Sequence, residues 1–265
     1  MPGNPRRKSF AGDKGFAEAP TLFDAAPPMG GPPIDLPASE AAVPGAEGHR
    51  ARMRARLLSA GPEALADHEM LEMVLFLALP RRDTKPIGRA LLKQFGSFGA
   101  VVAAPVPELL RIEGLGEAGA AALKTIQAAA LRLAKGEVMR RPVLNNWDRV
   151  IDYLTMILAH ERIEEFHVLF LDSRLHLLAD EVMGRGTINH APVYPREVMK
   201  RALELQAAAL ILAHNHPSGD PTPSREDIAM TRELQRAAQV LKIAIHDHVV
   251  VAGDRWVSFH QQGLL

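Results

Sequence analysis

Residues 207–227 read AAALILAHNHPSGDPTPSRED, and the architecture expected for the C-terminal half of the chain follows from this stretch. Its first part, residues 207–213, is a short apolar run typical of a buried strand. Residues 217–221, rich in Pro and Gly, predict a turn. A helical pattern of apolar residues begins after residue 224. The sequence therefore predicts a strand, a loop and a helix in succession.

Two histidines at the end of the predicted strand are placed to share one ion. Residues two apart in a strand point to the same face, so the β-carbons of His214 and His216 are expected roughly 6–7 Å apart. Asp227, in the first turn of the following helix, can fold back toward them across the loop. Two His and one carboxylate leave one tetrahedral position open, which is the pattern of a catalytic rather than a structural zinc site.

A simpler interpretation without metal accounts for part of the same motif. Ser224 and Asp227 have the spacing of a helix N-cap and an acidic N3 residue, which together form a capping box. An Asp in the first turn also interacts favourably with the helix dipole. On physical grounds alone, the metal site and the simple cap stay open as alternatives.

The same residues resemble a known signature. His214-x-His216-Pro217, six residues, and then Ser224-x-x-Asp227 are similar to the motif of the JAMM (MPN-plus) metalloproteases. The string HNHPSGDPTPS resembles the RadC branch of that family, and the resemblance covers about residues 48–265. It implies an α+β chain, in which an N-terminal all-α helix-hairpin-helix domain precedes an α/β JAMM/MPN-like domain with a mixed sheet.

The resemblance also implies a reaction. One Zn²⁺ per chain is expected on His214, His216 and Asp227, and the chain is expected to cleave an amide or isopeptide bond of a peptide or protein with a metal-activated water. In the family, the base is a Glu just before the strand that runs beside the metal. Glu164 fits this place best, and Glu165 is the alternative.

Further roles are expected for residues around the motif. Ser224 would cap the helix that presents Asp227, and the resemblance implies that its hydroxyl also donates to the oxyanion of the reaction. Residues 246–248 form a second His-x-His without a following third ligand. They are expected to supply a hydrogen bond to a ligand imidazole, or to lie at an edge of the fold.

Composition limits the class of protein. An apolar fraction of 47% in 265 residues is sufficient for a packed core. The absence of Cys excludes disulfides and thiolate metal ligands. The absence of Cys, together with the absence of a secretory pattern at the N-terminus, favours a cytoplasmic location. No uninterrupted apolar run is long enough to span a bilayer, so no membrane partner is expected.

The chain divides by composition and periodicity. Residues 1–47 are rich in Pro and lack apolar periodicity, which predicts a disordered tail. Residues 48–136 have a helical pattern throughout, and residues 137–146 have the composition of a linker. From residue 147 to 265, helices and strands alternate as in an α/β domain. The strands are expected at residues 166–171, 175–182, 207–213, 243–251 and 256–258.

An alternative function is that of a DNA-associated repair or recombination factor. Residues 48–141 carry 15 Lys and Arg against 9 Asp and Glu, with four arginines between residues 50 and 56. Gly114-x-Gly116 resembles the turn of a helix-hairpin-helix, whose amides can hold a DNA phosphate, and both glycines are expected at positive φ. Glu113 and Glu117 oppose such binding. The zinc would then be structural or nucleolytic.

A third hypothesis is an interaction scaffold with a vestigial site. The complete signature argues against it, because a drifting site is expected to have lost a ligand.

Overall fold

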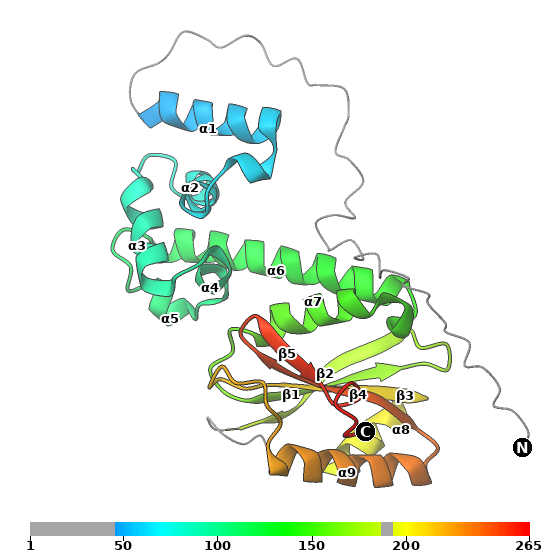
Figure 1. The fold of residues 1–265 in the computed structure, drawn as a ribbon. Helices are drawn as coiled ribbons and strands as arrows, with labels where there is room; N and C mark the ends of the chain where they lie inside the picture. The colour runs from blue at the N-terminus through cyan, green and yellow to red at the C-terminus, as the bar shows by residue number, and fades with distance from the viewer. Residues whose placement is uncertain (1–45, 187–192) are drawn as a thin grey trace, which may run out of the picture.

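The computed structural model describes residues 46–186 and 193–265, and Figure 1 shows its ribbon. A helical region precedes a five-stranded sheet with helices on both faces, which confirms the α+β fold class. The predicted tail, residues 1–47, lies outside the described residues apart from residues 46 and 47, which are helical. None of the described helices is both long and apolar enough to cross a membrane.

The N-terminal region packs around the long helix α6. The apolar segment predicted as a core helix is α2, and its Leu71 and Leu75 are fully buried with Leu91 of α3 and Leu123 of α6. Pro86 lies in the first turn of α3, as expected. The elements are α1 (Ala46–Ala60), the 3₁₀ helix η1 (Pro62–Ala64), α2 (Asp67–Ala78), α3 (Lys85–Phe95), α4 (Phe98–Ala103), α5 (Val106–Leu109) and α6 (Gly116–Arg140).

The glycine turn lies between α5 and α6. Gly114 and Gly116 have φ of 85° and 61°, so both occupy the left-handed region as predicted. The Arg82 guanidinium donates a 2.7 Å hydrogen bond to the Gly114 carbonyl, which joins the turn to the segment before α3. The helix-hairpin-helix assignment and any DNA contact of these glycines stay predictions.

Two arginines of α1 serve the helical region itself. Arg50 lies over the Phe76 ring. Its guanidinium also donates to three backbone carbonyls in the segment after α2, those of Leu79, Pro80 and Arg82. Arg56 forms an ion pair with Glu69 of α2. Part of the basic cluster that suggested a DNA-binding helix therefore holds α1 against α2.

The segment predicted as a linker, residues 137–146, is packed structure instead. Helix α6 continues to Arg140, and the 3₁₀ helix η2 (Val143–Asn146) leads directly into the next helix. Ala134 and Val138 lie on one face of α6 at i, i+4 spacing and are buried, with Val143, in the core against the sheet. The linker prediction was wrong because Arg140 and its neighbours are the exposed face of a helix whose other face is buried.

The C-terminal region contains the sheet. Its elements are α7 (Trp147–Leu158), β1 (Glu165–Leu171), β2 (Leu177–Arg185), α8 (Pro195–Glu204), β3 (Ala209–Asn215), α9 (Arg225–Val240), β4 (Ala244–Ala252) and β5 (Arg255–Ser258). The strand order is β2-β1-β3-β4-β5. Only β3 and β4 pair in parallel among the described strands, so the sheet is mixed, as expected.

The two faces of the sheet are covered by different helices (Figure 1). Ile211 and Ala213 of β3 pack in the core with α7 and the end of α6, whereas Leu210 and Leu212 pack in the core with α8 and α9. His214 continues the second series by strand alternation. The predicted ligand pair therefore leaves β3 on the side that α9 covers.

Replacing Val138 with Asn tests whether the end of α6 is part of the core. The change buries an amide in place of an apolar side chain, so we expect the free energy of unfolding to fall by at least about 2 kcal/mol. The matched control is Met139→Asn at the exposed neighbouring position. This control should change the free energy of unfolding by about 0.5 kcal/mol or less. Chemical denaturation measures both, and equal losses would contradict the packed arrangement.

Candidate metal centre

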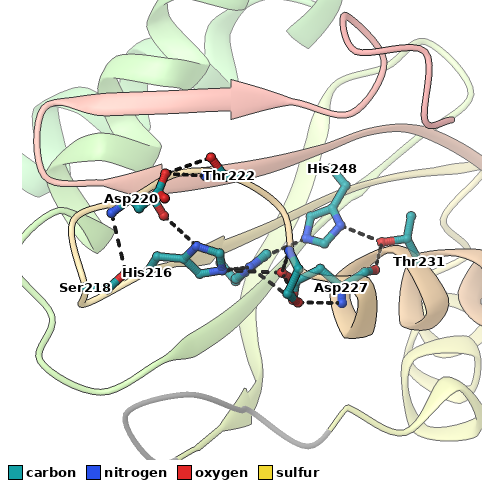
Figure 2. A network of polar contacts seen from close by, with 9 residues as sticks. His216, Ser218, Asp220, Thr222, Asp227, Thr231 and His248 are labelled. Atoms are coloured by element: carbon teal, nitrogen blue, oxygen red, sulfur yellow. Dashed lines mark hydrogen bonds and ion pairs between the residues drawn. The ribbon is translucent and has the colours of Figure 1, made fainter.

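The three predicted ligands meet between the end of β3 and the first turn of α9, and Figure 2 labels two of them, His216 and Asp227. The Nε2 atoms of His214 and His216 are 3.0 Å apart. Asp227 Oδ1 lies 3.4 Å from His214 Nε2, and its Oδ2 lies 3.4 Å from His216 Nε2. Within residues 46–186 and 193–265, this is the one group of three such side chains close enough to hold an ion.

These distances fit the edges of a metal tetrahedron. A zinc bond to nitrogen or oxygen is about 2.0–2.2 Å, so two ligand atoms at the tetrahedral angle are separated by roughly 3.3 Å. The distance between the two Nε2 atoms, and the distance from each of them to one oxygen of the Asp227 carboxylate, are therefore close to the spacing that a bound ion requires. All of these residues use atoms that suit a divalent cation of zinc type.

The buried ring of His248 sets the tautomer of His214. The Thr231 hydroxyl donates to the Asp227 backbone carbonyl at 2.6 Å, so it accepts from His248 Nδ1 at 2.7 Å. The Nε2 of His248 then accepts a hydrogen bond from His214 Nδ1 at 2.8 Å. His214 Nε2 is left with its lone pair directed at the ligand cluster.

His248 is held neutral by its surroundings. Its ring is fully buried and contacts the rings of Phe166 and Phe259, and this burial lowers the pKa of His248 well below its usual range. The expectation that the second His-x-His supplies a hydrogen bond to a ligand imidazole is thus confirmed for His248. Thr231 was not predicted. Its position four residues after Asp227, on the same helix face, is the signal that could have indicated it.

The loop after β3 orients His216 (Figure 2). His216 Nδ1 donates to the Asp220 carbonyl at 2.7 Å, so Nε2 carries the lone pair here too. Asp220 is held in place because its carboxylate accepts from the amide and the hydroxyl of Thr222. Gly219 has a φ of 82°, which permits the tight turn, and Arg255 of β5 donates to its carbonyl.

The charges in the cluster favour a cation. Burial alone would raise the pKa of Asp227, but His214 and His216, which donate to the carboxylate only when their Nε2 carries a proton, and Ser224 hold this pKa well below its usual range. The Asp227 carboxylate raises the pKa of His216, against the effect of burial, because it accepts a hydrogen bond from Nε2 when the ring is protonated. Two nitrogen lone pairs and a carboxylate at these distances repel one another unless a proton or a metal lies between them.

The capping box is present in the same motif. Ser224 is the N-cap of α9, and its Oγ accepts from the Asp227 amide at 3.0 Å. Asp227 Oδ2 accepts in return from the Ser224 amide at 2.7 Å and from its hydroxyl at 2.6 Å. The two alternatives from the sequence are therefore compatible, because the cap fixes the rotamer that turns Asp227 toward the histidines.

Strand alternation, extended one residue before β1, assigns the two candidate bases to opposite faces of the sheet. Phe166 packs on the α9 side of the sheet, so Glu164, two residues earlier, belongs to the side of the ligands. Its negative charge contributes to the raised pKa of His216, after the hydrogen bond to Asp227. Glu165 instead forms a 2.9 Å ion pair with Arg185 of β2. The arrangement favours Glu164 as the residue that faces the cluster.

Comparison with known proteins agrees with this geometry. Residues 144–264 match the model of the RadC-like JAB domain, and residues 48–121 match the UPF0758 N-terminal domain. The UPF0758 protein of Rhodobacter capsulatus is 54% identical over 213 residues, which cover 80% of this chain and 100% of that protein. The chain belongs to the RadC (UPF0758) family.

A second relative of the RadC family supports the same assignment. The UPF0758 protein of Ruegeria pomeroyi is 49% identical over 217 residues, or 82% of this chain and 97% of that protein. The JAB domain suggests a metal-dependent hydrolase of JAMM type, and the His–His–Asp cluster is compatible with the metal. The names of these relatives state no activity or substrate.

Replacing Thr231 with Val tests the hydrogen-bond chain behind His214. Without the hydroxyl, His248 loses the partner that fixes its tautomer, so we expect affinity for Zn²⁺ to fall about 10- to 100-fold while the chain stays folded. The matched control is Thr125→Val, because the Thr125 hydroxyl also donates to the carbonyl four residues earlier in its helix, far from the cluster. Competition with a chromophoric chelator measures both affinities, and equal values would contradict the assigned tautomers.

Proposed function

We propose that this RadC-family chain is a zinc-dependent hydrolase that cleaves an amide or isopeptide bond in a peptide or protein. The observation that supports the proposal most directly is the convergence of His214 Nε2, His216 Nε2 and Asp227 at 3.0–3.4 Å. A divalent ion held by these three residues would have room for a further ligand, as in catalytic rather than structural zinc sites.

His214, His216 and Asp227 would hold the ion. When bound, zinc supplies a Lewis acid for the substrate carbonyl and lowers the pKa of water toward neutrality. The full burial of His214 and the hydrogen bond from its Nδ1 to His248 keep this ligand rigid, so little reorganisation is needed during the reaction.

Glu164 is the proposed general base and acid. Its carboxylate would accept a proton from the attacking water and deliver it to the leaving nitrogen, so that an amine departs rather than an amide anion. The position of Glu164 on the ligand side of β1, close enough for its charge to act on His216, supports this role. A group in this role typically contributes about 10²- to 10⁴-fold in rate.

Ser224 is the proposed donor to the oxyanion. Its hydroxyl proton is directed at Asp227 Oδ2 in this structure, so the role requires the hydroxyl to turn toward the substrate. Asp227 would keep the Ser224 amide as a partner, which leaves the cap partly intact during such a turn. Donors of this kind contribute about 3–4 kcal/mol to transition-state stabilisation.

Two substitutions separate metal binding from catalysis. Glu164→Gln should retain Zn²⁺ and reduce kcat about 10²- to 10⁴-fold, because the proton acceptor is lost. Asp227→Asn should lose most of the Zn²⁺ affinity. The matched control for both is Glu226→Gln, an exposed acid beside Asp227 in the same helical turn. Zinc-loaded proteins are screened against peptide and isopeptide libraries. No turnover by the parent, or equal turnover by Glu164→Gln, would argue against the proposal.

Metal removal gives a test that needs no substrate. A ligand that binds only the folded chain stabilises it, by about 2.7 kcal/mol at a free concentration of 100 Kd. We therefore expect Zn²⁺ to raise the Tm of the parent and of Glu164→Gln, and to leave Asp227→Asn nearly unchanged. Differential scanning fluorimetry with and without a chelator measures the change, and an equal rise in Asp227→Asn would remove Asp227 from the ligand set.

A further inference from the structure

Asn215, between the two ligand histidines, is bonded to the loop that carries Glu164. It is buried, and by strand alternation its side chain leaves β3 on the face opposite to His214 and His216. Its Oδ1 accepts from the Glu165 amide at 2.8 Å. Its Nδ2 donates to the carbonyls of Glu161 and Ile163 at 3.1 and 3.0 Å.

The partners determine the orientation of this carboxamide. A backbone N–H requires an oxygen opposite it, and two carbonyls require the NH₂ group, so the flipped amide would lose its three bonds. Both N–H donors of Asn215 are used, and a single hydroxyl in place of its amide could not donate to both carbonyls. The residue between the ligands thus acts as an internal clamp on the loop.

The clamped groups surround Glu164 on both sides. They belong to residues 161, 163 and 165, and Glu164 itself bonds through its carbonyl to the Gly186 amide of the neighbouring strand segment. Because the backbone on either side of Glu164 is bonded to Asn215, Glu164 and the ligand pair are both positioned by residues 214–216 at the end of β3.

A second contact on this loop is weaker. Arg162 forms a bidentate ion pair with Glu108 of α5, but the Arg162 side chain is 62% exposed. Exposed pairs contribute little to holding a geometry, since water screens them and the long side chains lose entropy. Of these two side-chain contacts, the buried amide of Asn215 is therefore the one better able to fix the loop.

We infer that Asn215 is a positioning residue, which sets the place of the Glu164 carboxylate relative to the metal without touching metal or substrate. The inference rests on the proposed function, because it assigns Asn215 a role through the proposed base. It predicts that a change at Asn215 acts like a loss of Glu164, while metal affinity is retained.

The test is a double-substitution cycle with Co²⁺ as a spectroscopic probe of the full chain. The pH at which the visible spectrum of the Co²⁺-loaded protein changes should shift in Glu164→Gln by roughly one pH unit, since a nearby charge is removed. Asn215→Ser should shift it in the same direction, with Co²⁺ affinity within about 3-fold of the parent. Adding Asn215→Ser to Glu164→Gln should give no further shift. With a cleavable substrate, kcat should fall and KM stay constant.

The matched control is Asn146→Ser at the N-cap of α7, away from the cluster, which removes an amide that donates to the Glu137 carbonyl of α6. Should Asn215→Ser fail to fold, Asn215→Thr keeps a hydroxyl and a residue favoured in strands. A parent-like midpoint in the Asn215 variants, or a shift that adds fully to that of Glu164→Gln, overturns the inference alone. If Co²⁺ does not bind, or Glu164→Gln has no effect, the proposed function fails and the inference fails with it.

Discussion

The structure depends on the approach of three electron-pair donors that repel one another without a cation. His214 Nε2, His216 Nε2 and the Asp227 carboxylate lie at 3.0–3.4 Å, and two of the three side chains are almost fully withdrawn from water. Such a cluster costs folding free energy unless a positive charge is placed in it. The surrounding hydrogen bonds are arranged to keep the lone pairs directed inward rather than to relieve the repulsion.

Each ligand is fixed by a different kind of contact. A buried imidazole and a helix hydroxyl hold His214, a backbone carbonyl in a glycine turn holds His216, and a capping box holds Asp227. The capping box gives one residue pair two functions, because the bonds that begin α9 also set the direction of the Asp227 carboxylate. The ligands are thus carried by the strand, the loop and the helix of a single continuous segment, and His248 of β4 supports them from outside it.

The sheet separates the chemistry from the scaffold. The ligands and Glu164 belong to the face that α9 covers, while α6 and α7 pack on the other face. Helix α6 extends from the N-terminal core into this second core, so the helical region and the sheet are joined by buried side chains, not by a linker. Asn215 projects to the scaffold face, where it holds the loop of the proposed base.

Local pattern was enough to predict much of this chain. Strand alternation placed His214 and His216 together, the Ser224–Asp227 spacing predicted the cap, and the apolar runs predicted the strands, because these features depend on residues close in sequence. Tertiary structure alone decided that α6 continues through residues 136–140, that Thr231 and His248 orient His214, and that Asn215 bonds to the loop of Glu164. Those contacts join residues 17 to 54 positions apart, and only the packing of helices on a sheet of given strand order brings such residues together.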